Sequence, residues 1–140
     1  MRLHASCAAL DGAGVLLIGK PGCGKSDLLL RLVDAGFSLV ADDQVILVEG
    51  RASAPMALAG LLEVRGCGIF RLAFVATVPV AVIAELDTRA DRLPEPRRHP
   101  ALDVPMIHVD PSAASAVARV RLALDCACGR TSQLAGAFAA

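Results

Sequence analysis

The chain has 140 residues, which is long enough for one domain with a substantial hydrophobic core. Its 14 Lys and Arg balance its 14 Asp and Glu, so the net charge is zero and no basic surface predicts a nucleic-acid partner. No apolar stretch approaches the roughly 18 residues of a membrane-spanning helix, and the short mixed run after Arg2 is not a signal peptide. We therefore expect one domain over residues 1–140, with no membrane partner and with a flexible tail at 129–140.

The cysteines give no sign of a metal centre. No Cys-x-x-Cys pair occurs, so a zinc site is not expected. Their odd number and scattered positions indicate small free thiols in a reducing compartment, which favours a cytoplasmic protein. The five positions are Cys7, Cys23, Cys67, Cys126 and Cys128.

Apolar runs that are bounded by turn residues predict both strands and helices. Strands are expected at 3–10, 15–18, 37–41, 44–48, 78–86 and 104–109. One helix is expected at 26–35, and a second one begins with Asp110 as its N-cap, followed by Pro111. Residues 63–72 look like a loop or an irregular strand, and the polar, Pro- and Arg-rich segment 87–103 predicts a mobile surface loop.

The most informative motif is G-x-x-x-x-G-K-[ST], which follows the apolar run 15–18 and opens the first predicted helix. It reads Gly19-Lys20-Pro21-Gly22-Cys23-Gly24-Lys25-Ser26. Its glycines let backbone N–H groups close around phosphate oxygens, and the helix N-terminus favours negative charge. Lys25 is expected at the β- and γ-phosphates and Ser26 at Mg²⁺. The motif therefore predicts a nucleotide or another polyphosphate as ligand, the alternative being a glycine-rich turn without one.

Acidic residues follow two of the other predicted elements. Asp42 and Asp43 come directly after a strand, where phosphate-loop folds commonly place a carboxylate for Mg²⁺ or its waters. Two adjacent acids would let one hold metal while the other accepts a proton from an attacking hydroxyl. A two-residue hairpin turn is the alternative, because Asp tolerates left-handed geometry. Glu63 and Arg65 are either a surface ion pair or part of a loop that brings a carboxylate to metal.

The isolated histidines and an arginine-rich segment give weaker signals. His4, on an apolar strand, is by itself more typical of a structural residue, and His99 and His108 are interpreted as surface or structural residues. The arginines of 87–103 fit a solvated loop, although Arg is also the natural clamp for a phosphoryl group in transfer.

The order of these motifs along the chain resembles the catalytic domain of HPr kinase/phosphorylase, over about residues 1 to 111. That family phosphorylates a serine of the small phosphocarrier HPr and reverses the reaction by phosphorolysis with inorganic phosphate. The combination of motifs is more specific than the phosphate loop, which many families share. The matching pieces are Leu3-His4-Ala5-Ser6-Cys7, the phosphate loop, Val40-Ala41-Asp42-Asp43, Glu63-Val64-Arg65-Gly66-Cys67-Gly68-Ile69 and Asp91-Arg92-Leu93.

The resemblance implies an α/β phosphate-loop kinase domain, similar to that of phosphoenolpyruvate carboxykinase. It implies an ATP- and Mg²⁺-dependent serine kinase that acts on an HPr-like phosphocarrier of a phosphotransferase system, and a homo-oligomer, since the family is typically hexameric. Because the core begins at residue 1, the chain resembles the short forms that consist of the catalytic domain only.

The resemblance also implies roles for individual residues. The phosphate loop would bind ATP, and the residues that meet Mg²⁺ would be Ser26 and Glu63, with Asp42 beside them. Asp43 would be the base of the forward reaction, and Lys25 would stabilise the transferred charge. Two further residues fall at active-site positions of the family, His4 and Arg92.

One departure from the family concerns the reverse reaction. Family members usually carry a Pro-Gly-Arg-Asn stretch near the last strand, linked to dephosphorylation, whereas this chain reads Val109-Asp110-Pro111-Ser112 and has no Asn. We therefore expect phosphorolysis to be much weaker than the kinase direction, or absent.

Two other functions stay open, a nucleotide-sensing regulatory module with little catalysis and a small-molecule phosphate-loop kinase. A GTPase switch is disfavoured, because its guanine-reading Asn-Lys-x-Asp motif requires Asn.

Overall fold

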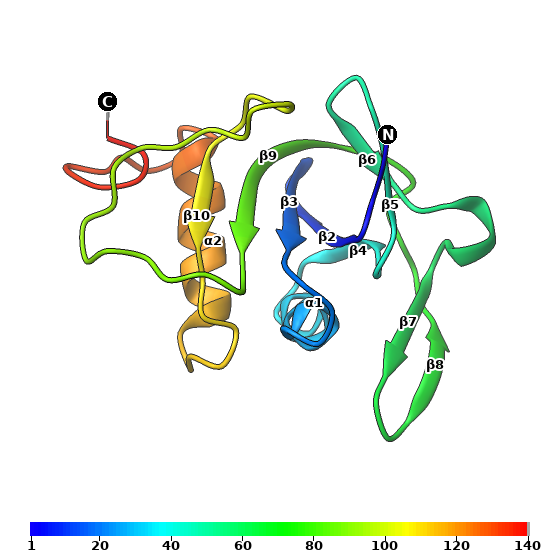
Figure 1. Ribbon diagram of the computed structural model, residues 1–140. Coiled ribbons are helices and arrows are strands. Elements are labelled where there is room, and N and C mark those ends of the chain that lie inside the picture. Colours follow the sequence, from blue (N-terminus) through cyan, green and yellow to red (C-terminus); the bar gives the residue numbers. More distant parts are fainter. Residues whose placement is uncertain (140) are drawn as a thin grey trace.

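A computed structural model describes residues 1–139 of the chain, as a curled sheet with two helices packed on one face (Figure 1). The helices are α1 (Lys25–Asp34) and α2 (Ala116–Ala127), and a short 3-10 turn covers Met56–Leu58. The strands of the main sheet are β1 (Arg2–Leu3), β2 (Ala5–Leu10), β3 (Ala13–Ile18), β4 (Ser38–Ala41), β5 (Val45–Val48), β6 (Arg51–Ser53), β9 (Val78–Glu85) and β10 (Met106–His108). A separate hairpin joins β7 (Leu61–Val64) to β8 (Gly68–Arg71) and packs against α1 through β7.

The central strands are buried on both faces, which explains why β3 reads as a continuous apolar run. Val15 and Leu17 of β3 face the core beneath α1 and α2, whereas Leu16 faces a second core. The sheet curls so that β5 and β6 lie against β2 and β4 and enclose this second core. Both faces are therefore sealed from water, and polar chemistry is left to the edges of the sheet.

Four strands end at one edge of the sheet. The strand order is β1-β5-β6-β9-β3-β2-β4, with β10 beside β9. β3, β9 and β10 are parallel, and β4 runs the same way because both β3 and β4 pair antiparallel with β2. Open α/β sheets bind ligands at the carboxyl ends of such strands. The segments that leave this edge are the phosphate loop, the Asp42–Asp43 turn, and the loops after β9 and β10.

The mixed α/β class and most of the expected strands are confirmed, as is the first helix. The uniform strand expected at 3–10 is wrong, because the chain bends at His4 and β1 pairs with β5 instead. A hairpin turn at Asp42–Asp43 is also wrong, since β4 and β5 are not neighbours in the sheet. The loop or irregular strand expected at 63–72 is wrong, because most of this segment belongs to the regular β7–β8 hairpin, which turns at Gly66.

The predicted start of the second helix is wrong as well. The Asp110 carboxylate accepts hydrogen bonds from the N–H (2.9 Å) and the hydroxyl (2.7 Å) of Ser112, which closes a local turn instead of capping a helix. The same bonds hold the pKa of Asp110 below its usual range, the hydroxyl contributing most. The helix begins only at Ala116.

The segment 87–103 contains neither helix nor strand, but its second half is tied to β10. The Met106 N–H donates to Arg97 O and the His99 N–H to Val104 O, both at 2.9 Å. In the tail, Phe138 packs against the helix-side core and its N–H donates to Gln133 Oε1. The mobility of both segments stays a prediction.

Within residues 1–139, no helix is both long and apolar enough to cross a membrane.

Candidate active site

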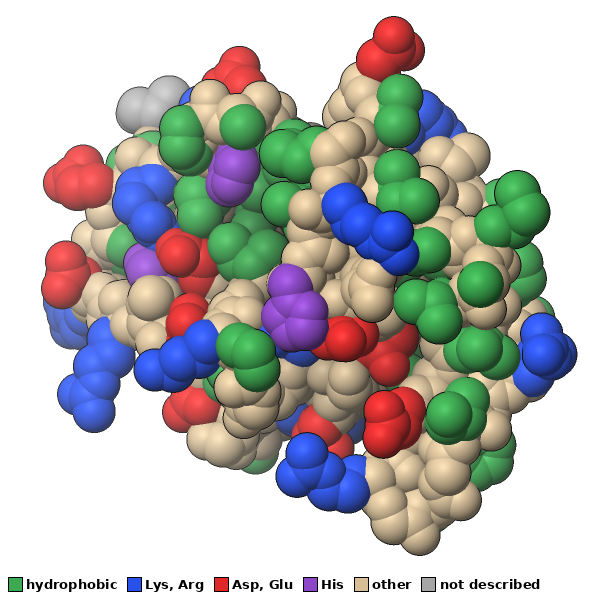
Figure 2. Space-filling view, turned by 45° about the vertical axis from the view of Figure 1, so that its right-hand side comes forward, with side chains coloured by type: hydrophobic (Ala, Val, Ile, Leu, Met, Phe, Trp, Pro, Cys, Tyr) green, Lys and Arg blue, Asp and Glu red, His purple; other side chains and the backbone are tan. Residues whose placement is uncertain are grey.

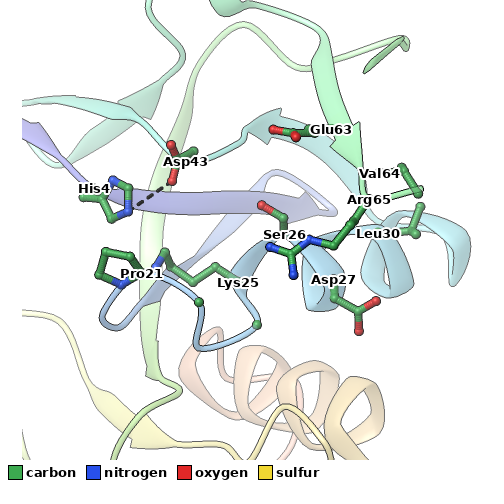
Figure 3. A pocket seen from close by; sticks show the side chains of 12 residues that line it. His4, Pro21, Lys25, Ser26, Asp27, Leu30, Asp43, Glu63, Val64 and Arg65 are labelled. Atoms are coloured by element: carbon green, nitrogen blue, oxygen red, sulfur yellow. Dashed lines mark ion pairs between the residues drawn. The ribbon is translucent and has the colours of Figure 1, made fainter. Parts of the chain in front are cut away.

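A pocket of about 600 Å³ opens at the sheet edge where the four strands end. In the space-filling view, histidine, acidic and basic side chains gather in the middle of the face that contains it (Figure 2). The phosphate loop forms its floor, and the Asp42–Asp43 turn and the β7–β8 hairpin form its wall (Figure 3). The lining residues are His4, Pro21, Gly22, Gly24, Lys25, Ser26, Asp27, Leu30, Asp43, Glu63, Val64 and Arg65.

The phosphate loop has the backbone that its sequence predicts. Gly22 and Gly24 both have positive φ, 81° and 107°, which glycine adopts at little cost. A Cβ at Gly22 would meet no atom within 4 Å, so the loop is open to the pocket there. The first intrahelical bond runs from Leu28 N–H to Gly24 O, which leaves the N–H groups before Leu28 without an acceptor inside the helix. Free N–H groups at a helix N-terminus favour an anion.

Lys25 is buried, with 6% of its surface exposed, and its ammonium group lies inside the loop. Nζ donates to Gly19 O at 2.7 Å and to Lys20 O at 3.2 Å. These carbonyls position the charge without neutralising it, and no carboxylate pairs with Lys25 in residues 1–139. Nζ also lies 3.9 Å from Cys23 Sγ, but a thiol sulfur is only a weak acceptor, so a bound anion would compete well for this third N–H.

Asp42 is turned toward the phosphate loop. The Ser26 hydroxyl donates to Asp42 Oδ1 at 2.7 Å, and the Glu63 N–H reaches Asp42 Oδ2 at 3.4 Å. Because the Ser26 hydrogen is directed to the carboxylate, the lone pairs of its oxygen are free for another partner. The hydrogen bond between Ser26 and Asp42 therefore joins the first turn of α1 to the end of β4.

Asp43 is turned to the opposite side, toward His4. The His4 Nε2 and Asp43 Oδ1 atoms lie 3.1 Å apart, and both side chains are about half exposed to the pocket (Figure 3). Asp43 has a φ of 67°, and its carbonyl accepts the Ala5 N–H at 3.1 Å. The left-handed residue is what sends two adjacent carboxylates in different directions.

The hairpin supplies one acidic and one basic side chain, Glu63 and Arg65, to the pocket wall. Figure 3 shows Glu63 on the side of Asp43, and Arg65 reaching from the turn toward Ser26 and Asp27. The pocket lining holds three carboxylates and two permanent cations, Lys25 and Arg65. A polyphosphate would add more negative charge, so the lining fits a phosphate ligand that arrives with its own cation.

The described residues contain no cluster of three or more His, Cys, Asp or Glu side chains that could hold a metal ion by themselves. Mg²⁺ differs from metals held in such cages, because it is usually bound by one or two carboxylates together with substrate phosphates and water. The Ser26 hydroxyl and the Asp42 carboxylate, with Glu63 at the pocket wall, fit that mode.

Arg92 is not brought to this pocket. It lines a second cavity of about 310 Å³, which lies between the segment 90–94, β10, α2 and the tail. The sequence-predicted site is therefore assembled in one place except for this arginine.

Two residues of the site were missed from the sequence. Ser6 lies beneath the Asp42–Asp43 turn, hidden in an apolar strand where its hydroxyl gives no signal. Asp87 follows β9 and its Oδ2 accepts the Lys20 N–H at 3.1 Å, which ties the phosphate loop to the neighbouring strand. The position of Asp87 directly after a strong predicted strand was a usable signal.

The chain is thus a mixed α/β protein. A glycine-rich loop of the phosphate-binding type and an acidic turn meet at one edge of its sheet. The family model described as "HPr Serine kinase C-terminal domain" matches residues 1–76, just over half of the chain. The chain belongs to that family.

Curated relatives agree with this assignment, and one solved structure shares the fold. HPr kinase/phosphorylase of Clostridium tetani is 44% identical over 72 residues, that of Bacillus pumilus 47% over 75, and that of Chlorobium chlorochromatii 36% over 108. These matches cover 49%, 50% and 64% of this chain but only 24%, 24% and 32% of the relatives, so the chain matches a quarter to a third of their length. The structure of the Hpr(Ser) kinase/phosphatase from Coxiella burnetii superposes with a TM-score of 0.72 at 24% identity, covering 93% of this chain and 96% of that one. It shares the fold.

Proposed function

We propose that this chain is the catalytic domain of a cytoplasmic, ATP- and Mg²⁺-dependent kinase that phosphorylates a serine of an HPr-like phosphocarrier protein. The observation that carries the proposal is the opposed orientation of the two acids: Asp42 bonds to Ser26 of the phosphate loop, and Asp43 faces the open pocket with His4. The names of the relatives, HPr kinase/phosphorylase, and the family match support the choice of acceptor. A homo-oligomer belongs to the same proposal.

The proposed ATP site is the phosphate loop. The phosphates of ATP would lie against the free N–H groups at the start of α1. The Lys25 ammonium would contact the γ-phosphoryl group, which is transferred. Ser26, Asp42 and Glu63 would hold Mg²⁺, which would supply positive charge to the phosphate oxygens. Asp42 keeps the Ser26 hydroxyl oriented throughout, because it holds that hydrogen.

Asp43 is the proposed general base. Its carboxylate takes the proton of the acceptor serine, the serine oxygen bonds to the γ-phosphorus, and the bond from that phosphorus to the β–γ bridging oxygen breaks. ADP and the phosphoserine carrier are the products. His4 holds the carboxylate at the pocket mouth, where a protein side chain can reach it. Arg92 has no step in this scheme, since it lines the other cavity.

The proposal is tested by incubating purified chain with ATP, Mg²⁺ and a candidate HPr, and weighing the carrier by intact mass spectrometry. Addition of one phosphate, mapped to a serine, is expected, and none is expected when EDTA is present. Tight ATP binding without transfer to the carrier would favour a nucleotide-sensing module instead. Transfer to small hydroxyl compounds but not to the carrier would favour a small-molecule kinase.

A further inference from the structure

Only two polar or charged side chains are buried in residues 1–139, and both belong to the candidate active site. One is Lys25, and the other is Ser6, which is fully buried in β2. A buried hydroxyl is unfavourable unless it is hydrogen-bonded, so its bonds identify its role.

The Ser6 hydroxyl lies between the two acids. Its oxygen accepts the Asp43 N–H at 3.1 Å, and its hydrogen is donated to Asp42 Oδ1 at 3.2 Å. Asp42 Oδ1 is also the atom that accepts the Ser26 hydroxyl. The backbone of the base, the buried hydroxyl, the metal-side carboxylate and the phosphate loop thus form one continuous chain of hydrogen bonds.

Three consecutive residues, His4 at the bend and the first two residues of β2, hold Asp43 in its left-handed conformation. His4 contacts its carboxylate, the Ala5 N–H bonds to its carbonyl, and Ser6 accepts its N–H. A non-glycine residue at a φ of 67° is sparsely populated and persists only when its surroundings determine it. Ser6 is the only one of the three that contacts both acids.

We propose that Ser6 is a positioning residue that couples the two acids, fixing the carboxylate of Asp42 against Ser26 while it fixes the backbone of Asp43. The inference rests on the proposed kinase function. It assigns Ser6 no contact with substrate, because the side chain is sealed from the pocket. Groups that orient a metal-side ligand in this way typically change metal affinity or activity about 10- to 100-fold when removed.

The test compares Ser6→Ala with Cys7→Ala, a matched control. Cys7 is the next residue of β2 and is equally buried, but it contacts neither acid. With a non-hydrolysable ATP analogue bound, calorimetric Mg²⁺ titration of Ser6→Ala is expected to give about 10- to 100-fold weaker affinity, and kcat is expected to fall in parallel while KM for the carrier stays within about twofold. Ser6→Thr, which keeps the hydroxyl, is expected to restore both quantities.

Cys7→Ala is expected to keep the Mg²⁺ affinity and kcat of the wild type, although it also removes a buried group. Unchanged Mg²⁺ affinity and kcat in folded Ser6→Ala, or equal losses in both variants, would overturn the inference. If Ser6→Ala does not fold, Ser6→Cys gives the same comparison, because a thiol is only a weak hydrogen-bond donor and acceptor.

The same data separate this inference from the proposed function. If the wild-type chain transfers no phosphate but Ser6→Ala weakens Mg²⁺ binding to the nucleotide complex, the positioning role stands and the kinase proposal fails. If the wild type is an active kinase and Ser6→Ala equals it in both measurements, the positioning role alone fails.

Discussion

His4 and Asp43 are far apart in the sequence, yet His4 Nε2 and Asp43 Oδ1 lie 3.1 Å apart at the mouth of the pocket. The bend between β1 and β2 leaves His4 outside the sheet ladder, and the left-handed Asp43 turns its carboxylate toward it. The neighbouring Asp42 is directed to Ser26 instead. One short turn therefore presents one carboxylate to the phosphate loop and another to the open pocket.

Lys25→Ala is expected to abolish phosphoryl transfer while the domain stays folded. The Lys25 ammonium is the one charge of the loop that lines the pocket, and loss of such a preorganised group typically costs 10²- to 10³-fold in kcat. Arg71→Ala is the control, because Arg71 is an exposed cation that does not line the pocket. Transfer is measured by intact mass of the carrier and folding by circular dichroism. A folded Lys25→Ala variant with wild-type kcat would contradict the assignment.

Asp87 is expected to affect ATP binding through two opposed terms. Its hydrogen bond to the Lys20 N–H orders the loop, whereas its charge repels phosphate. Asp87→Asn keeps an acceptor without the charge and is expected to bind ATP at least as tightly as the wild type. Asp87→Ala loses both and is expected to bind about 3- to 10-fold more weakly than Asp87→Asn, as for one hydrogen bond. Equal dissociation constants in the two variants, by calorimetry, would show that the loop does not need this bond.

Thiol labelling is expected to report the geometry of the loop. Burial raises the pKa of the Cys7 thiol to about 12, so Cys7 is protonated and unreactive at neutral pH in the folded protein. Cys67 and Cys128 are exposed and are expected to react with iodoacetamide first. Cys23, within the phosphate loop, is expected to be protected by ATP and Mg²⁺ while Cys67 is not. Peptide mapping measures each rate, and equal Cys23 rates with and without nucleotide would place the ligand elsewhere.

Phosphorolysis is expected to be much slower than the kinase reaction. Asp110 stands where the family usually has an arginine-containing stretch, and its Ser112 hydrogen bonds lower its pKa. The adjacent Pro111 would lie 3.3 Å from a Cβ at Gly24 of the phosphate loop. An anion that attacks there meets a negative charge. Asp110→Asn is expected to raise the reverse rate relative to the forward rate. The assay is pyrophosphate release from the phosphorylated carrier in excess phosphate, and comparable wild-type rates in both directions would refute this expectation.

The phosphate loop and most strands of the sheet were predictable because they depend on local patterns, whereas the short β6 was missed. The apolar run of β3, the glycines and the first helix are contiguous, and each part fixes the next. The Asp42–Asp43 turn was not decided locally, because a hairpin and an active-site turn use the same residues. The choice depends on the strand order, in which β4 is at the end of the sheet beside β2, while β5 lies on the far side of β3, β9 and β6.

The misplaced second helix has the same kind of cause. Asp110 and Pro111 have the residue types of a helix start, but Ser112 captures the Asp110 side chain, and the Arg31 guanidinium binds the Pro111 carbonyl from α1. Ser6 could not be found from the sequence, since only the turn packed above it distinguishes its hydroxyl from the other small residues of β2.

The division of labour between Asp42 and Asp43 is the central claim, and a paired comparison of Asp43→Asn with Asp42→Asn tests it most directly. Each variant is measured for kcat and for Mg²⁺ affinity in the presence of a non-hydrolysable ATP analogue. The account predicts that Asp43→Asn loses kcat by at least about 10²-fold with nucleotide and Mg²⁺ binding retained, because Asn cannot accept the proton. It predicts that Asp42→Asn loses Mg²⁺ affinity, because the Ser26 side of the pocket loses its charge. Lost Mg²⁺ binding in Asp43→Asn, with only turnover lost in Asp42→Asn, would show that the roles are reversed.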